Sequence, residues 1–183
     1  MSIDAQENLF DDGVAYKTII MDPPWLESGG GKCKRGADRH YPLLKTKDIP
    51  KVILSSGLYN PDPNGCHIYC WVTNNFLPDG LWLLEQLGVR YITNICWIKD
   101  KFGLGQYFRG QHELVLFGRY GKTMLPTNRT VPSVFHAPRT RHSKKPEEFY
   151  KIVESVSPAP RLDLFARAER AGYDVWGNEI RPS

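Results

Sequence analysis

The sequence predicts an α/β fold in which a mostly parallel sheet is covered by helices on both faces. Five short apolar segments, rich in β-branched and aromatic residues, alternate along the chain with two helix-like stretches. The apolar segments largely lack the polar alternation of a sheet with one wet face, which indicates strands that are covered on both sides. With 183 residues, 41% of them hydrophobic, the chain is long enough to bury a core, and one domain is expected over residues 1–183.

The amino-terminal half contains two expected strands and one expected helix. Residues 17–21 (KTIIM) and 67–72 (HIYCWV) are short and rich in the residue types that favour strands. Residues 76–87 place apolar side chains at positions 77, 81, 84 and 87, and Gly88 follows as a stop signal. This spacing predicts an amphipathic helix directly after the second strand.

The carboxyl-terminal half supplies three more expected strands and a second helix. Residues 91–98 (YITNICWI), 113–117 (ELVLF) and 161–165 (RLDLF) have the same strand-like composition. Residues 146–156 begin with a proline and two glutamates, a combination typical of a helix N-terminus. Strands that alternate with helices in this way favour a parallel sheet.

Two long segments, 26–47 and 101–143, show little regular pattern and are rich in Gly, Pro and basic residues. Segments of this length in a compact domain are often functional loops, and local disorder is the alternative interpretation. Seven Lys or Arg residues against two acids lie within 30–51, and ten against two lie within 99–145. A solvated surface can account for such clusters, but two basic segments with interspersed aromatic residues also suit a polyanion such as nucleic acid.

The chain shows no sign of a membrane span or a secretory signal. No apolar stretch approaches the roughly 18–20 residues that a spanning helix needs. The first residues include Asp4, Glu7, Asp11 and Asp12, where a signal peptide would be basic and then apolar. The expected location is therefore the cytoplasm, with no membrane partner.

Metal and phosphate motifs are not matched. The four cysteines and five histidines lack the spacing of metal ligands, so buried free thiols and structural or surface histidines are expected in place of a metal site. The run Ser28–Lys32 is not a phosphate loop, because Cys33 stands where Ser or Thr is required. The glycine pair Gly103 and Gly105 lacks the third glycine of a dinucleotide fingerprint.

One tetrapeptide, Asp22-Pro23-Pro24-Trp25, follows a predicted buried strand directly. It is therefore expected at the carboxyl end of that strand, where ligands of open α/β sheets bind. The prolines can hold the Asp22 carboxylate and the Pro23 carbonyl as two rigid acceptors beside an aromatic face. This set suits an adenine amino group, and the alternative is a stiff turn followed by a core tryptophan.

The chain also resembles a known family, the S-adenosylmethionine-dependent adenine methyltransferases related to the catalytic subunit of the eukaryotic mRNA adenosine methyltransferase. The resemblance runs from about residue 16 to residue 180 and does not depend on a single motif. It is carried by IIMDPPW at 19–25, YPL at 41–43, WVTN at 71–74, CWIK at 96–99, GQHELVL at 110–116, SKKPEE at 143–148, ESVSP at 154–158, LFAR at 164–167 and WGNE at 176–179. The resemblance implies a Rossmann-like methyltransferase fold of circularly permuted type, in which the catalytic motif comes early and the cofactor strand, 161–165, comes late.

The resemblance also implies roles for individual residues. Asp22 and Pro23 would receive the adenine amino group within the catalytic motif Asp22–Trp25, and Trp25 would stack on a base flipped out of the helix. S-adenosylmethionine would be bound by Asp22, Lys145, Arg167, Glu169, Asn178 and Glu179, with Lys145 pairing with its carboxylate. Substrate contacts are expected from Tyr41 and His112, and from the basic residues Lys32, Lys34, Arg35 and Arg39.

The implied activity is methylation of the exocyclic amino group of adenine in nucleic acid, with DNA favoured over RNA because no accessory domain is evident in the chain. The implied partners are nucleic acid and, as in other family members, a second copy or a related subunit. Two other functions remain open at this point. One is an inactive nucleic-acid-binding partner subunit, and the other is a protein glutamine methyltransferase, whose related motif has Asn and Tyr at its ends.

Overall fold

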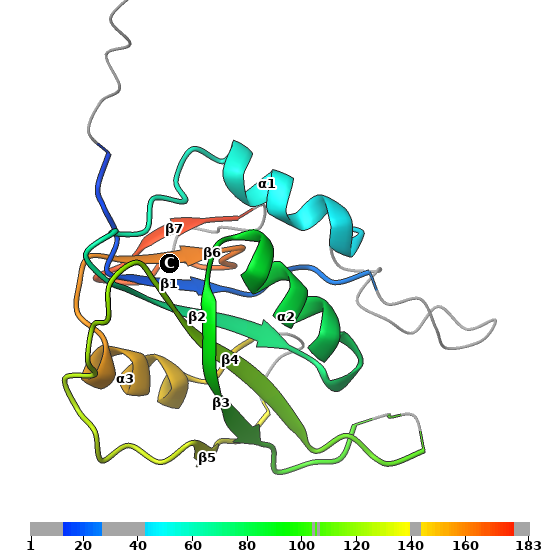
Figure 1. The fold of residues 1–183 in the computed structure, drawn as a ribbon. Helices are drawn as coiled ribbons and strands as arrows, with labels where there is room; N and C mark the ends of the chain where they lie inside the picture. The colour runs from blue at the N-terminus through cyan, green and yellow to red at the C-terminus, as the bar shows by residue number, and fades with distance from the viewer. Residues whose placement is uncertain (1–12, 27–42, 104, 106, 140–143, 178–183) are drawn as a thin grey trace, which may run out of the picture.

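The computed structural model describes residues 13–26, 43–103, 105, 107–139 and 144–177. Its centre is a seven-stranded sheet with the order β5-β3-β4-β2-β1-β6-β7 (Figure 1). The strands are β1 (Thr18–Met21), β2 (Cys66–Val72), β3 (Arg90–Ile98), β4 (His112–Tyr120), β5 (Val134–His136), β6 (Arg161–Leu164) and β7 (Asp174–Trp176). The helices are α1 (Ile49–Ser55), α2 (Leu77–Gln86) and α3 (Glu147–Val156), and two short 3-10 turns, Thr46–Asp48 and Asn74–Phe76, precede α1 and α2.

The sheet is mostly parallel, as the sequence predicts. Strand β1 pairs in parallel with β2 on one side and with β6 on the other, and β5 and β7 are parallel to their neighbours. Only β4, inserted between β2 and β3, runs against its neighbours among the described strands. Met21, the last residue of β1, is in register with Cys70 and Leu164, so the carboxyl ends of β1, β2 and β6 lie at one edge of the sheet.

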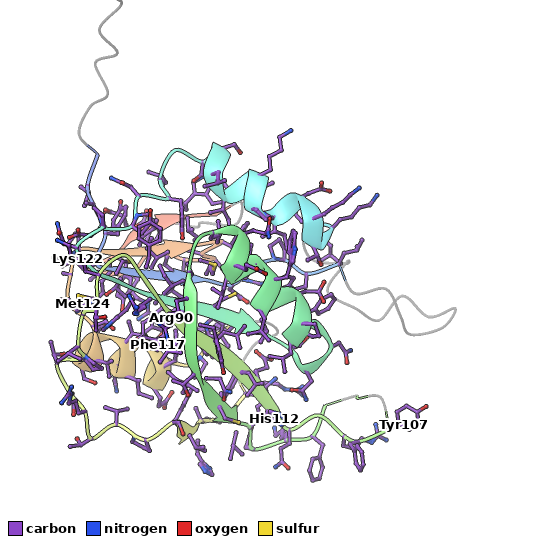
Figure 2. All side chains as sticks on the ribbon, in the orientation of Figure 1. Arg90, Tyr107, His112, Phe117, Lys122 and Met124 are labelled. Atoms are coloured by element: carbon purple, nitrogen blue, oxygen red, sulfur yellow. The ribbon has the colours of Figure 1, made fainter. Side chains whose placement is uncertain are left out.

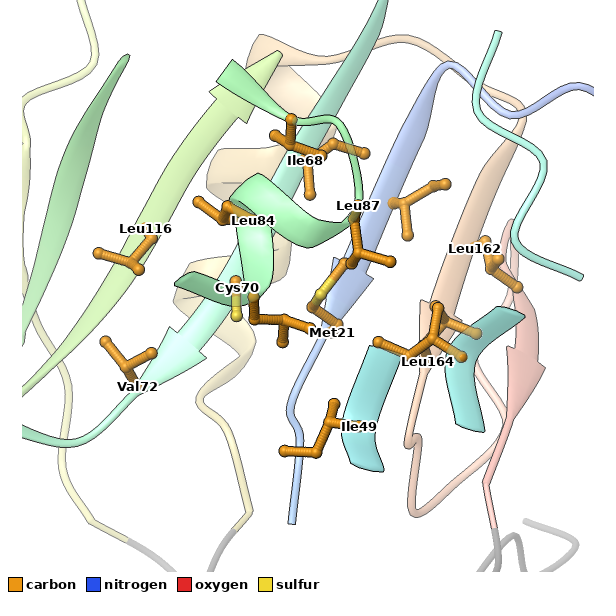
Figure 3. Packing of buried hydrophobic residues seen from close by; sticks show 14 of the residues in the cluster. Met21, Ile49, Ile68, Cys70, Val72, Leu84, Leu87, Leu116, Leu162 and Leu164 are labelled. Carbon is orange, nitrogen blue, oxygen red and sulfur yellow. The ribbon is translucent and has the colours of Figure 1, made fainter. Parts of the chain in front are cut away.

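Helices cover both faces of the sheet, and each face has its own apolar core. On one face α1 and α2 pack on alternate residues of β1 and β2, including Met21, Ile68 and Cys70 (Figure 3). On the other face α3 packs through Phe149 and Val153 on Ile20, Tyr69 and Trp71, among other residues. The even and odd positions of the central strands therefore face different helices, which explains why these strands are apolar throughout.

All five predicted strands and both predicted helices are present, with small differences at their ends. Strand β4 extends three residues beyond the predicted 113–117 at its carboxyl end and one at its start. The prediction that every strand is covered on both faces is wrong for β3, whose first four residues are exposed. These residues lie near an edge of the sheet, because β5 pairs only with the last three residues of β3.

Three short elements are not apparent in the sequence pattern. Strands β5 and β7 have three residues each, which is too few to show alternation, and α1 has seven residues with a proline in its first turn. The segment 101–143, expected to be mostly irregular, thus contains β5 as well as β4. The predicted segment 26–47 lies largely outside the described residues.

Cys66 and Cys70 are free and buried in β2, as expected, and Cys96 is free and partly buried. Burial raises the pKa of the Cys66 thiol to about 12 and raises that of Cys70 further, which keeps both thiols protonated. Cys33 lies outside the described residues. In the described parts of the chain, no helix combines the length and the apolar character needed to cross a bilayer.

Candidate active site

Asp22 lies where the sequence places it, immediately after β1 at the carboxyl edge of the sheet. Its backbone N–H donates to the carbonyl of Leu164 at 3.2 Å, which ties it to the neighbouring strand β6. Beyond it, the Leu44 N–H donates to the Pro24 carbonyl at 2.9 Å, and a returning bond from Leu26 to Leu44 measures 3.1 Å. The tetrapeptide is therefore fixed from both sides, in addition to the restriction that its two prolines impose.

The Pro23 carbonyl, expected as the second acceptor, already accepts a hydrogen bond of 2.9 Å from the Trp25 N–H. A carbonyl oxygen has two lone pairs, so one remains for a ligand. The Trp25 bond also closes a tight turn and fixes the direction of this carbonyl.

Trp25 itself lies differently from the expectation that it stacks on a flipped base. Its side chain is only 7% exposed, and its ring stacks on Phe76 at 5.5 Å between centroids and 15° between planes. Its Nε1–H donates to the Trp71 carbonyl at 3.1 Å. The indole is thus a core side chain that anchors the loop to the ends of β2 and α2, and it offers no free face for a base in this conformation.

Lys145, which comes just before α3, connects two acids at this edge of the sheet. Its ammonium lies 3.1 Å from Asp22 Oδ1 and 3.0 Å from Glu113 Oε2, and 4.6 Å from the centroid of the Trp71 ring. Glu113 is the second residue of β4, and its other carboxylate oxygen accepts a short hydrogen bond from Lys99 at the end of β3. Four charged side chains from four segments therefore form one continuous chain, which we call the charge relay: Lys99, Glu113, Lys145 and Asp22.

The charge relay perturbs the pKa of each acid differently. Burial raises the pKa of the Asp22 carboxyl above its ordinary value, and the cations Lys145 and Arg167 offset part of this shift. Burial also disfavours ionised Glu113, but the Lys145 and Lys99 ammonium groups outweigh it and hold the pKa of Glu113 at about 2. The two acids in turn keep Lys145 protonated, since they raise its pKa despite burial. Glu113 is thus held as an anion, whereas for Asp22 burial outweighs the nearby cations and the net shift of its pKa is upward.

Glu113 and Lys99 were not selected from the sequence as site residues. Both lie within motifs of the resemblance, CWIK and GQHELVL. The sequence pattern that points to them is a charged residue at the carboxyl end of one apolar strand and a second charged residue at the start of the next strand. Because β3 and β4 are antiparallel, these two positions become cross-strand neighbours at the functional edge.

A second buried acid, Asp163, lies in the middle of β6 and was also not selected. It is 5% exposed, and the Tyr150 hydroxyl donates to its Oδ2 at 3.1 Å. Burial raises its pKa to about 7, and the charge of Asp22 adds to the shift, while the Tyr150 bond and the cations Arg170 and Lys145 oppose it. Asp163 therefore belongs electrostatically to the same region as the charge relay.

The raised pKa of Asp163 predicts a pH-dependent contribution to stability. The folded form holds the proton more tightly than the unfolded chain does, so this group stabilises the fold most below pH 4, and that contribution is lost as the pH rises toward 7. Asp163→Asn keeps an acceptor for Tyr150 and does not ionise. Chemical denaturation should show the variant gaining stability relative to the wild type between pH 4 and pH 7, by up to about 1.4 kcal/mol per pH unit. A stability difference that does not vary with pH would contradict this account.

The remaining predicted residues divide into three groups. Arg167, three residues after β6, is close enough to Asp22 to lower its pKa. His112 is exposed at the start of β4, paired with Ile98 of β3, and Glu169 is exposed in the segment after β6. The others lie outside the described residues: Lys32, Lys34, Arg35, Arg39, Tyr41, Asn178 and Glu179.

Comparison with known proteins gives a consistent picture over nearly the whole chain. A family model described as MT-A70 matches residues 16–179. The "Type II methyltransferase M.MunI" of Mycoplasma sp is 29% identical over 185 residues, which cover 90% of this chain and 78% of that protein. The "N(6)-adenine-specific methyltransferase METTL4" of Mus musculus is 26% identical over 200 residues.

A plant relative, the "N(6)-adenosine-methyltransferase MT-A70-like" of Arabidopsis thaliana, is 28% identical over 180 residues. The chain spans 40% of the length of the mouse protein and 24% of that of the plant protein, while most of its own length is matched in both. The match therefore corresponds to one part of these larger proteins and to most of the bacterial one.

Proposed function

The chain belongs to the MT-A70 family, and from this membership together with the site geometry we propose that it is an S-adenosylmethionine-dependent enzyme that methylates the exocyclic amino group of adenine in nucleic acid. The observation that carries the proposal is the position of Asp22. Its carboxylate follows β1 at the carboxyl edge of the sheet, is held by the tie to Leu164 and by two prolines, and contacts a buried ammonium.

The reaction requires that a poor nucleophile be oriented. The lone pair of the adenine amino nitrogen is delocalised into the ring, so the nitrogen must be drawn toward tetrahedral geometry before it can attack. We assign this role to Asp22, which accepts one N–H, and to the Pro23 carbonyl, whose remaining lone pair accepts the other. Positioning and the stabilisation of positive charge on the nitrogen then lower the barrier, and the extra proton leaves after transfer.

Lys145 supports this role by holding the Asp22 carboxylate. The 3.1 Å contact fixes one oxygen, Oδ1, and we assign the other oxygen to the substrate. Because the ammonium is shared with Glu113, it cannot move toward Asp22 without losing its second partner. Lys145 is therefore a positioning residue for the catalytic acid, in addition to the cofactor role that the family resemblance assigns to it.

The site also fits the cofactor. An ammonium group has three N–H donors, and the Asp22 and Glu113 contacts use two of those of Lys145, which leaves one for a ligand carboxylate. Asp163 in β6 adds a buried carboxyl, and Arg167 just after β6 adds a positive charge, which a ligand carboxylate can use. S-adenosylmethionine supplies the methyl group when bound. We assign its remaining polar contacts to Glu169, Asn178 and Glu179.

We favour DNA as the substrate, since a bacterial relative, of which this chain covers 78%, is named a type II methyltransferase. A base inside a duplex cannot reach Asp22, so the target adenine is either flipped out or already unpaired, at a cost of roughly a few kcal/mol. Because Trp25 is buried, its part in this proposal is to anchor the catalytic loop and not to stack on the base.

The direct test is incubation with labelled S-adenosylmethionine and matched DNA and RNA pools, followed by digestion and mass spectrometry of the nucleosides. We expect label in N6-methyladenine from DNA above that from RNA. Label in protein glutamine would instead identify a protein methyltransferase. Cofactor binding without transfer to any pool would support an inactive partner subunit.

The basic loops provide a further prediction. Lys34 and Arg35 lie in the basic segment that follows the catalytic tetrapeptide. If this segment holds the phosphate backbone, Lys34→Ala/Arg35→Ala should weaken DNA binding and reduce the log–log salt slope by roughly 0.7–0.9 for each phosphate that is no longer neutralised. The measurement is fluorescence anisotropy over a salt series, with calorimetry to show unchanged cofactor affinity. An unaltered slope would mean that the segment is an ordinary solvated surface.

A further inference from the structure

A loop with exposed aromatic side chains joins β3 to β4, and we call its described residues, 99–103, 105 and 107–111, the aromatic hairpin. Three of its rings lie in solvent: Phe102 is 67% exposed, Phe108 is 86% exposed and Tyr107 is fully exposed. Figure 2 shows Tyr107 at the tip of this loop, pointing away from the body of the molecule, while His112 marks the point where the loop rejoins the sheet. Large apolar side chains at such exposure are costly to leave in water and indicate a contact surface.

The hairpin backbone is built to hold these rings outward. Its two sides are joined by hydrogen bonds from the Lys99 N–H to the Gln111 carbonyl at 2.8 Å and from the Gly103 N–H to the Gly110 carbonyl at 2.7 Å. A Cβ at Gly105 would collide with the Phe108 carbonyl oxygen, so only glycine fits this turn. Tyr107 has a φ of +61°, which is unfavourable for a residue with a side chain.

The base of the hairpin is part of the active site. Lys99 at its start and Glu113 just after its end are paired, and Glu113 is joined through Lys145 to Asp22. The hairpin also leaves the sheet from the carboxyl end of β3, the same edge at which Asp22 lies. The exposed rings therefore lie on a hairpin whose first residue, Lys99, belongs to the charge relay.

The charges and rings of the aromatic hairpin indicate which ligand it binds. Lys101 and Arg109 are exposed in the same segment as the rings, so the aromatic hairpin combines flat apolar faces with positive charge. A single nucleic-acid strand presents the complement, flat bases along an anionic backbone. A protein surface would have to provide both apolar pockets and anionic groups for these side chains, so the charges favour nucleic acid.

We propose that Tyr107 and Phe108 stack on bases that flank the target adenine, and so hold the strand when the target has left the helix. This inference rests on the proposed function and adds the substrate contact that Trp25 does not make. In the sequence, Phe102 lies between Lys99, at the base of the hairpin, and these two rings. Stacking of this kind tolerates any base, so the hairpin adds affinity without setting the sequence that is methylated.

The test compares variants in binding to a fluorescent single-stranded oligonucleotide rich in adenine, over a salt series. Tyr107→Ala/Phe108→Ala should weaken binding by about 5- to 140-fold for each ring that stacks, with an unchanged salt slope, because the removed groups are uncharged. Tyr107→Phe/Phe108→Tyr keeps both rings and should bind as the wild type does. Tyr91→Ala is the matched control, since it removes an exposed ring at the opposite end of β3.

Arg109→Ala, unlike the ring variant, should change the salt dependence of binding. If Arg109 contacts a phosphate, the log–log salt slope should fall by roughly 0.7–0.9. Equal affinities of the ring variant, the Tyr91→Ala control and the wild type would overturn the inference. So would sedimentation showing that the ring substitutions only dissociate a dimer, because the rings would then contact a second copy of the chain. A wild-type protein that binds strands through these rings but methylates no pool would contradict the proposed function, and the stacking of the rings on bases would still stand.

Discussion

Asp22→Ala should reduce methyl transfer by roughly a hundred- to a thousandfold in kcat, because one oriented acceptor of the amino group is removed. Asp22→Asn should be nearly as damaging, although it keeps the shape of the side chain, because it replaces an anion with a neutral amide that can present an N–H to the substrate. Initial rates with labelled S-adenosylmethionine on the preferred nucleic acid measure both effects.

The fold should survive both substitutions, since Asp22 lies in a loop at the edge of the sheet and contributes no apolar core, and its loss leaves Lys145 paired with Glu113. Circular dichroism and denaturation establish this point. Asp62→Ala is a suitable control, because it removes another acid paired with a lysine, Lys17, away from the carboxyl edge. Near wild-type turnover in Asp22→Ala would refute the assignment of this residue and, with it, the mechanism.

Lys145→Ala should lower both stability and cofactor affinity. Removal of one partner from a buried ionic contact costs about 3–5 kcal/mol, and the slight exposure of these side chains places the expected loss near the lower value, about 3 kcal/mol. The affinity for S-adenosylmethionine should fall by roughly 1–3 kcal/mol if a charged hydrogen bond to the cofactor is removed. Urea denaturation and calorimetry measure the two effects separately.

Lys99→Ala is the matched control for Lys145→Ala. It removes the other ammonium that contacts Glu113 but leaves the contact between Lys145 and Asp22 intact. Its cofactor affinity should stay close to that of the wild type, while some stability is lost. If Lys145→Ala bound the cofactor normally, the cofactor pocket would have to lie elsewhere along the carboxyl edge.

Much of this protein could be predicted from local sequence. The apolar segments of β1, β2 and β6 are continuous because both of their faces are buried, so the pattern reports a covered sheet directly. Asp22 could be selected because it follows such a strand directly, at the edge where ligands of open α/β sheets bind, and two prolines restrict the backbone after it. Lys145 and Arg167 could be selected only through the family resemblance, since neither has a local signal of its own.

Other features depend on contacts between distant residues and were decided by the tertiary structure. The role of Trp25 depends on Phe76, which stacks on its ring, and on the Trp71 carbonyl, which accepts its indole N–H, and the tetrapeptide contains neither residue. Antiparallel β4 begins at the edge where β3 ends, which brings Glu113 to Lys99, and Lys145 then joins Glu113 to Asp22.

The sequence by itself therefore determined the layers of the fold and the position of the proposed catalytic acid, because burial on two faces and a proline-fixed turn are local properties of the chain. Only the tertiary structure decided the direction in which the pKa of that acid shifts, since the pKa depends on burial and on the charges of Glu113, Lys145 and Arg167, which are more than ninety residues away in the sequence. It also decided which aromatic rings are free to meet a base: Trp25 is covered by packing, whereas Tyr107 and Phe108 are held in solvent by the backbone of the hairpin.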